Sequence, residues 1–478
     1  MRRGVIAAGL LLVFSTGLVA AQKSQKPKPP SKPAAVRSAE SEAMEWYVKG
    51  DAYVGTPEEG SAAQLEAYRK AVELDPSLSV VRMNLALLHA RKGEYQTALE
   101  QLEEILKRGP EQADALYLSG EFLLQSRQPE QARERFARVI TGDPKHAGAL
   151  AGLGKLSLEA KQYAEASGFY ALSVQVKPTT ESYYNLGLAE LQLGRRDQAV
   201  EALQKALALA PEDPDVLGLL GIVQLQQSKL PDAVASLRKA LAGKPEALWY
   251  SHLGVALEQS KDFAGAAAAF QKAVEINPGS ADDWAQLGIV RVRLKQNDVA
   301  MVSLQKAIAL DGRHFAALAT FGDLLLDRRD YEAAVQTYRR ALEVNPKDFF
   351  TSFNLGLALS EGGRSEEALV AFRATLELAP DSGEVHRHLG LLYDKAGNVE
   401  SAIEYFWKSL NNAPRAGSHF RLGVLLARIG QGDAALEQLE KAVALEPKLK
   451  QMLRDELRNV HSDLDSVRYK QRFAEIIK

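Results

Sequence analysis

The sequence predicts an all-α protein built as a solenoid of repeated helical hairpins. Prolines recur at intervals of 33 or 34 residues through most of the chain, and glycines and alanines recur with the same period. A fixed period of this length is typical of chains made of stacked supersecondary units. The composition agrees, because 25% charged and 46% hydrophobic residues describe a globular protein and not a disordered one.

Residues 1–21 are predicted to be a secretory signal peptide. Arg2 and Arg3 form a positive start, and an uncharged stretch follows from Val5 to Val19. The small residues Ala20 and Ala21 suit signal peptidase, so the mature chain would begin at Gln22. The apolar run is close to the minimum of about 17 residues for a membrane span, so an uncleaved membrane anchor is the alternative.

Residues 22–40 are predicted to be a basic, Pro-rich linker. Up to Arg37 this segment contains four prolines and five cations, which prevent a helix and bury nothing. A solvated spacer is the simpler interpretation, and attraction to an anionic envelope surface is the functional one. Seven basic and no acidic residues precede position 38, so the rest of the chain carries the acidic excess.

Residues 41–447 are predicted to contain twelve repeats, defined by three series in phase. The prolines that end the units are Pro76, Pro110, Pro144, Pro178, Pro211, Pro245, Pro278, Pro346, Pro380, Pro414 and Pro447, with Gly312 in one place. The glycines are Gly120, Gly154, Gly187, Gly221, Gly254, Gly288, Gly322, Gly356, Gly390 and Gly423. The alanines follow twelve residues later, at Ala132, Ala166, Ala199, Ala233, Ala266, Ala300, Ala334, Ala368, Ala402 and Ala435.

Each unit is predicted to form two helices. In residues 180–211 apolar side chains recur every three or four positions, Gly194 stands at a turn that favours positive φ, and Pro211 ends the second helix. Glycine inside a helix costs about 1 kcal/mol against alanine. Its recurrence therefore predicts a compensating close contact between two helix backbones, which Gly and Ala leave room for.

These features resemble the tetratricopeptide repeat, a 34-residue helix–turn–helix unit. The spacing of Trp46, Gly50 and Tyr53 matches the aromatic start of such a unit, while Gln64 stands where Ala is usual and Ala86 stands where Gly is usual. The resemblance implies a right-handed superhelix. It also implies that the first helix of each unit lines a concave side, where extended peptides or helices bind.

Residues 448–478 are predicted to form C-terminal capping helices. An apolar stripe covers one face of the first, and repeat stacks need such a cap for solubility. The stripe consists of Leu449, Met452, Leu453, Leu457 and Val460. A partner-binding helix is the alternative for this segment.

Signs of catalysis or of a bound cofactor are absent from the sequence. There is no cysteine and no nucleophile elbow, metalloprotease, EF-hand or P-loop motif, so we expect no catalytic, cofactor-binding or metal-binding residues. His386, His388 and His419 cluster in the sequence but lack further ligands. The balance of 59 basic and 61 acidic residues gives no reason to expect nucleic acid as a partner.

A partner-binding surface is the remaining functional hypothesis. The residue after the packing glycine is usually polar in the tetratricopeptide family, and here it is apolar in four consecutive units. The candidate partner-binding residues are Tyr184, Asn185, Leu188, Leu191, Leu219, Ile222, Leu225, Val255, Ile289 and Val292. Packing between repeats is the competing explanation for this stripe.

The sequence thus predicts a non-enzymatic scaffold for protein–protein interactions, located in the periplasm or outside the cell. A protein or peptide is the expected partner, and a membrane would be involved only if the signal segment is uncleaved. The alternatives are a membrane-anchored component of envelope assembly or polysaccharide export, and the regulatory subunit of an enzyme.

Overall fold

The computed structural model describes residues 38–411, 414–457, 472 and 474–476, and this part of the chain is helical without strands. The described chain divides into two compact units, one up to Lys161 and the other from Gln162 onward. The first 37 residues, which include the predicted signal peptide and most of the linker, lie outside the described residues.

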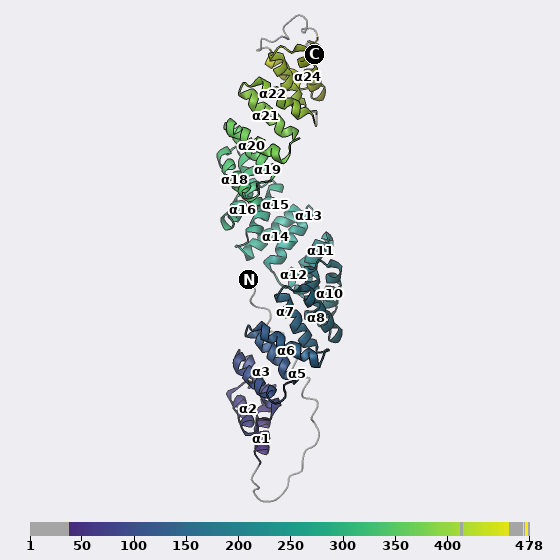
Figure 1. The fold of residues 1–478 in the computed structure, drawn as a ribbon, viewed down its shortest axis with the longest axis vertical. Helices are drawn as coiled ribbons and strands as arrows, with labels where there is room; N and C mark the ends of the chain where they lie inside the picture. The colour runs from purple at the N-terminus through teal and green to yellow at the C-terminus, as the bar shows by residue number, and fades with distance from the viewer. Residues whose placement is uncertain (1–37, 412–413, 458–471, 473, 477–478) are drawn as a thin grey trace. The chain divides into compact units, whose positions relative to one another are not determined.

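Helices α1 to α24 alternate between the first and second helix of a repeat (Figure 1). The first helices are α1 (Ala39–Asp51), α3 (Ser79–Arg91), α5 (Ala113–Gln125), α7 (Ala147–Glu159), α9 (Thr180–Gln192), α11 (Pro214–Gln226), α13 (Ala247–Gln259), α15 (Ala281–Arg293), α17 (Phe315–Asp327), α19 (Phe349–Glu361), α21 (Gly383–Lys395) and α23 (Ala416–Arg428).

The second helices are α2 (Ala62–Leu74), α4 (Tyr95–Leu106), α6 (Pro129–Gly142), α8 (Tyr163–Val176), α10 (Arg196–Leu209), α12 (Leu230–Gly243), α14 (Phe263–Ile276), α16 (Asn297–Leu310), α18 (Tyr331–Val344), α20 (Ser365–Leu378), α22 (Val399–Leu410) and α24 (Gly432–Leu445). The predicted all-α solenoid is confirmed.

From the second repeat on, the turn inside the repeat ends the first helix with a residue at positive φ. After α9, the N–H of Gly194 donates to the Leu191 carbonyl at 3.0 Å, and that of Arg195 donates to the Glu190 carbonyl at 2.9 Å. These two bonds form a Schellman motif, which needs a residue at positive φ. Gly194 has φ of 75°, as predicted. In other repeats a non-glycine residue adopts positive φ at this position; these residues are Arg127, Lys161, Ser228, Lys261, Lys295 and Arg329.

The recurrent glycine of the first helix faces a large side chain of the second. A Cβ placed on Gly221 would lie 2.6 Å from the Leu237 side chain, and one on Gly322 would lie 2.6 Å from the Tyr338 ring. The opposing side chains are essentially buried throughout: Tyr68, Phe136, Leu203, Leu237, Phe270, Leu304, Tyr338, Phe372, Phe406 and Leu439. Glycine is therefore required because the second helix drives a ring or a leucine against its backbone.

The backbones of the two helices also approach each other closely at this point. A Cβ on Gly187 would lie 3.3 Å from the Ala199 carbonyl oxygen, and Ala199 itself is fully buried. The predicted role of the in-phase glycines and alanines is thus confirmed, and the large buried side chain beside them is an addition that the sequence analysis did not make.

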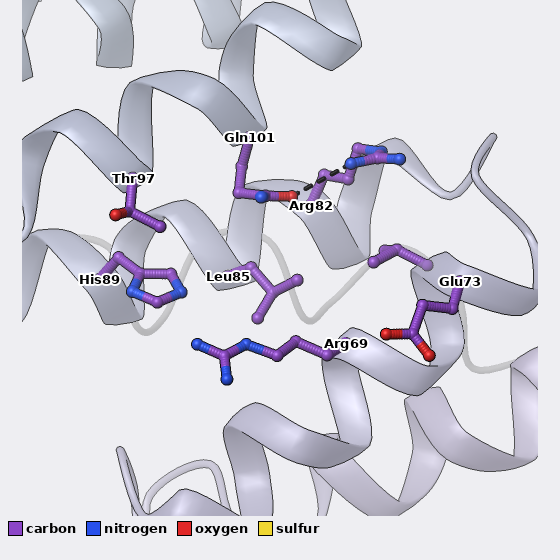
Figure 2. A pocket seen from close by; sticks show the side chains of 8 residues that line it. Arg69, Glu73, Arg82, Leu85, His89, Thr97 and Gln101 are labelled. Atoms are coloured by element: carbon purple, nitrogen blue, oxygen red, sulfur yellow. Dashed lines mark hydrogen bonds between the residues drawn. The ribbon is translucent and has the colours of Figure 1, made fainter.

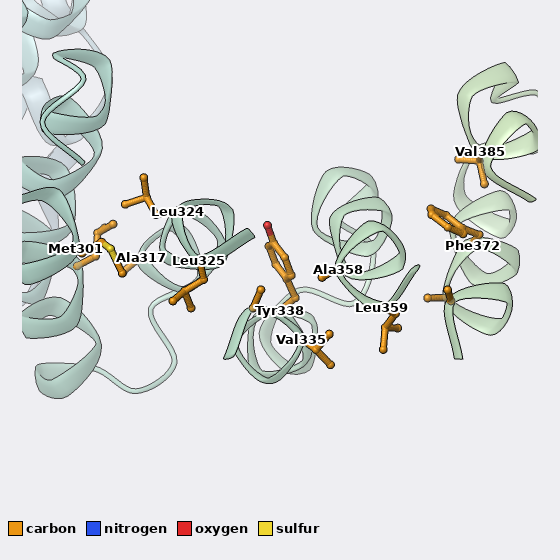
Figure 3. Close-up of a cluster of buried hydrophobic side chains, with 14 of the residues drawn as sticks. Met301, Ala317, Leu324, Leu325, Val335, Tyr338, Ala358, Leu359, Phe372 and Val385 are labelled. Carbon is orange, nitrogen blue, oxygen red and sulfur yellow. The ribbon is translucent and has the colours of Figure 1, made fainter. Parts of the chain in front are cut away.

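The hydrophobic core of the second unit consists of successive clusters that each extend over more than one repeat. In Figure 3, side chains from α16 to α21 gather in one such cluster, with Tyr338 near its centre and its hydroxyl pointing away from Val335. Second helices contact the first helix of the next repeat, as α18 does with α19. Each repeat therefore shares its core with its neighbours, which is the arrangement of a quasi-one-dimensional stack.

Gln64 explains one departure from the repeat pattern. It occupies the place of the usual small residue in α2 and is buried. Its Nε2 donates to the Gly50 carbonyl at 3.1 Å, and its Oε1 accepts from the Gly60 N–H at 2.6 Å. The amide thus ties the longer first turn to α1, because a buried polar side chain is stable only when its groups are paired.

The last described helix, α25 (Leu449–Leu457), follows the twelfth pair. Leu449 and Leu453 are buried in the C-terminal core cluster together with Ile476, whereas Met452 is exposed. Val460 lies outside the described residues. The buried face of α25 covers the apolar side of the last repeat, which is what a cap has to do.

We expect Gly221→Leu to cost about 3 kcal/mol of unfolding free energy or more, because the new side chain would overlap Leu237. Gly194→Ala should cost only about 1 kcal/mol, since its sole penalty is a methyl group at positive φ. Denaturant unfolding followed by circular dichroism measures both. Gly221→Leu should also broaden the transition, because damage stays among neighbouring repeats. Equal stability of the two variants would contradict the packing described here.

Candidate functional site

First helices of neighbouring repeats in the second unit contact each other in two runs, α9 to α13 and α15 to α19. Helix α9 contacts α11, α11 contacts α13, α15 contacts α17, and α17 contacts α19. The residue that follows the packing glycine holds the same place in each of them. These helices carry every candidate partner-binding residue of the sequence analysis.

Leu188, Ile222, Val255 and Ile289 are all half-buried. Each packs against a core cluster with part of its side chain and leaves the rest accessible, and Ile222 touches two clusters. The stripe is therefore neither a wholly exposed groove nor a wholly enclosed core. We call these four residues the apolar row.

The remaining candidates divide into two groups. Leu191 and Leu219 are only 8% and 6% exposed, so they belong to the core and offer no surface to a partner. Both are enclosed in a cluster formed by α9, α10 and α11, which also contains Val223. The half-buried group comprises Tyr184, Asn185, Leu225 and Val292, which lie beside the apolar row.

Tyr184 borders a small charged group at one end of the row. Lys244 Nζ lies 3.0 Å from Asp215 Oδ1 and 2.6 Å from Glu246 Oε1. Burial, reinforced by the negative charge of Asp215, raises the pKa of the Tyr184 phenol. The ring thus keeps its proton and presents a neutral hydroxyl.

The apolar row continues beyond the four predicted residues, which the sequence analysis missed. In α17 the equivalent residue is Asp323, and in α19 and α21 it is Leu357 and Leu391, both half-buried. The sequence could have identified these positions, because each is the residue directly after a packing glycine, here Gly322, Gly356 or Gly390.

Asp323 is the polar interruption of this extended row. Its Oδ1 accepts from the Tyr338 hydroxyl at 2.7 Å and from the Asn354 amide at 2.8 Å. Although the residue as a whole is exposed, partial burial of the carboxyl group raises the pKa of Asp323. The hydrogen bonds that Tyr338 and Asn354 donate to it oppose that rise. Burial of the Tyr338 phenol, followed by the negative charge of Asp323, strongly raises the pKa of that phenol.

The three clustered histidines bind protein groups instead of a shared ligand. His386 Nε2 lies 3.0 Å from the Pro380 carbonyl oxygen, and His419 Nδ1 lies 2.7 Å from Gln438 Oε1. His388 packs between Phe353 and Phe372, and burial followed by the charge of Arg387 lowers its pKa to about 4. Among the described residues, no group of three or more His, Asp or Glu is arranged to hold a metal ion.

A separate pocket of about 330 Å³ lies in the first unit, between α2, α3 and α4 (Figure 2). Leu85 separates Arg69 from Arg82, and Arg82 Nη1 donates to Gln101 Oε1 at 3.1 Å. His89 is buried at its rim and contacts Glu94. This pocket contains none of the predicted partner-binding residues.

The helices in the described part of the chain are too short or too polar to cross a membrane.

Comparison with known proteins finds relatives that share part of the chain. A human protein O-mannosyl-transferase, TMTC3, is 24% identical over 220 residues, which is 45% of this chain and 20% of that protein. The type IV pilus assembly protein PilF of Pseudomonas aeruginosa is 27% identical over 140 residues, or 28% of this chain and 54% of that protein. The chain thus spans between a fifth and about half of the length of these curated relatives.

Among solved structures, a tetratricopeptide repeat protein from Parabacteroides merdae superimposes with a TM-score of 0.39 at 18% identity. The superposition covers 52% of this chain and 98% of that one.

The family models extend over most of the repeat region. One model, described as tetratricopeptide repeat, matches residues 83–127, 184–247, 225–281, 286–349, 319–382, 353–417 and 389–449. A second with the same description matches residues 123–191. Together they span residues 83–449, which is well over half of the sequence. The chain therefore belongs to the tetratricopeptide repeat family.

Proposed function

We propose that this protein is a non-enzymatic scaffold that binds a segment of a partner protein along the first helices of its second unit. The observation that carries the proposal is the apolar row. Four successive repeats hold Leu, Ile or Val half-buried at one equivalent position, where the family usually has a polar residue. Apolar area that the repeats themselves leave accessible is available for a partner to cover.

Covering the accessible part of the apolar row would stabilise a complex. Covering apolar surface contributes about 25 cal/mol per Å², so the exposed part of a half-buried Leu or Ile is worth about 1 kcal/mol. Four such side chains, together with the half-buried Tyr184 and Val292, would contribute about 6 kcal/mol. This is of the same order as the cost of association, so other contacts have to supply the net affinity. The fixed spacing of the helices holds these groups in place before the partner arrives.

The names of the relatives support a role in assembly more than a role in catalysis. PilF is named as a pilus assembly protein, and another relative, cut9 of Schizosaccharomyces pombe, is named as a subunit of the anaphase-promoting complex. The human relative is named as a transferase, but the match spans 20% of it. We therefore propose binding without catalysis.

Site-directed photo-crosslinking tests the location of the partner. The full chain would carry the crosslinking residue p-benzoylphenylalanine in place of Val255 or Ile289 of the row, and in place of Val302 as control. Val302 is 52% exposed on the second helix α16. We expect partner adducts from the two row positions and none from Val302. Adducts from Val302 alone would contradict the proposed surface.

Two matched pairs of substitutions separate binding surface from core. Leu188→Asn with Ile222→Asn alters the half-buried row, whereas Leu191→Asn with Leu219→Asn makes the same change at buried sites of the same helices. We expect the first pair to lower the unfolding free energy by about 2 kcal/mol. The second should lower it by about 5 kcal/mol, because it removes core side chains and buries unpaired amides. Equal losses in chemical denaturation would mean that the row is core.

For the location of the protein, we propose export to the periplasm or the cell exterior, on the basis of residues 1–21 of the sequence. We expect N-terminal sequencing of the mature protein to begin at Gln22 and cell fractionation to find it outside the cytoplasm. A chain that retains Met1 in the membrane fraction would favour the anchored alternative. A chain that retains Met1 in the cytosol would contradict export.

A further inference from the structure

Asp323 gives the binding surface a chemical preference that the apolar row alone does not have. It stands in α17 between Ile289 of α15 and Leu357 of α19, which hold the equivalent positions in the adjoining repeats. A partner that follows the surface across these three helices meets an apolar side chain, a carboxylate and an apolar side chain in succession.

The carboxylate is fixed in place but not neutralised. Tyr338 and Asn354 both donate to Oδ1, and no Lys, Arg or His in the described part of the chain forms an ion pair with Asp323. The charged groups that act most strongly on it are Asp327 and Asp348, both negative. An exposed, oriented carboxylate among other acids attracts a cation, and it does so most strongly where apolar surroundings exclude water.

An exposed aromatic ring lies on α19, the helix that donates the Asn354 hydrogen bond to this carboxylate. Phe350 is 73% exposed, and it precedes Asn354 by one helical turn on α19. Its ring makes an edge contact with Phe349, which stacks in turn on Phe353. A ring held in this way offers its face to the stem or the charge of a long cationic side chain.

The spacing of the row matches one face of a partner helix. Packed helices lie about 8–10 Å apart, so the equivalent positions of α15, α17 and α19 repeat at about that distance. In an α-helix, residues seven positions apart lie on the same face and are separated by about 10.5 Å. The row is also two side chains wide where Val292 lies beside Ile289, which suits the paired apolar positions of a heptad.

We propose that the partner segment is an amphipathic helix whose apolar face contains one Lys or Arg, and that this cation pairs with Asp323. The inference rests on the proposed function, because it specifies the occupant of the same surface. The cation lies between apolar residues seven positions before and after it, which contact Ile289 and Leu357.

A displayed library of three-heptad helices tests this inference. Every member has Leu at the paired apolar positions except for one central position, which is varied among Arg, Lys, Gln, Glu and Leu. No other cation is present in the helices. The library is selected on the full chain, and sequencing then gives the frequency of each residue at the central position.

Two variants of the chain provide the comparison. Asp323→Asn removes the charge but keeps an oxygen that accepts from Tyr338 and Asn354, so the fold is retained. Asp232→Asn removes an equal charge from the exposed start of α12 and serves as the control. We expect Arg and Lys to be enriched about tenfold over Gln on the wild type and on Asp232→Asn, and not on Asp323→Asn.

The other outcomes overturn the inference in distinguishable ways. Equal enrichment of cations on Asp323→Asn would place the contact elsewhere. Binders without a cation preference that are lost on Leu357→Asn would leave the surface as a binding site and remove the role of Asp323. If the wild type retains no helix of the library, the helical partner is wrong, while the photo-crosslinking result decides the proposed function independently.

Discussion

The contact on which the rest of the structure depends is the one between a glycine in the first helix of a repeat and a ring or leucine in the second. The pair Gly322 and Tyr338 is representative: the tyrosine is fully buried and lies against a backbone without a side chain. This contact fixes how closely the two helices of a repeat pack. The packing in turn sets which face of the first helix remains for the neighbouring repeats and which face remains for a partner.

The sequence predicts the helix pairs well because the same glycine contact is needed in almost every repeat. A glycine that is required in one unit is required in nearly all, so helix pairs, turns and small residues can be located by counting. Gln64 shows the limit of counting, since its replacement of a small residue makes sense only once its bonds to Gly50 and Gly60 are known. Such contacts depend on backbone positions that a linear pattern does not contain.

The candidate site is less accessible to sequence analysis, for a different reason. Leu188 and Leu191 lie on the same apolar side of α9, yet the first is half-buried and the second is covered by the next repeat. Periodicity identifies the apolar side of a helix, but the exposure of each member depends on what the adjoining helix pair covers. Asp323 was missed because the count from the packing glycines was not carried past Ile289, although the sequence contained the position.

The interruption at Asp323 also bears on how a partner would be aligned. A surface built from near-identical repeats has an approximate translational symmetry, so a uniformly apolar ligand could bind in several registers that differ by one repeat. From α9 to α21 the equivalent position holds Leu188, Ile222, Val255, Ile289, Asp323, Leu357 and Leu391. One charged residue in this series makes the registers unequal, in the way that a single polar residue in the seam of a coiled coil fixes its alignment. Asp323 thereby defines one binding register along an array of near-identical repeats.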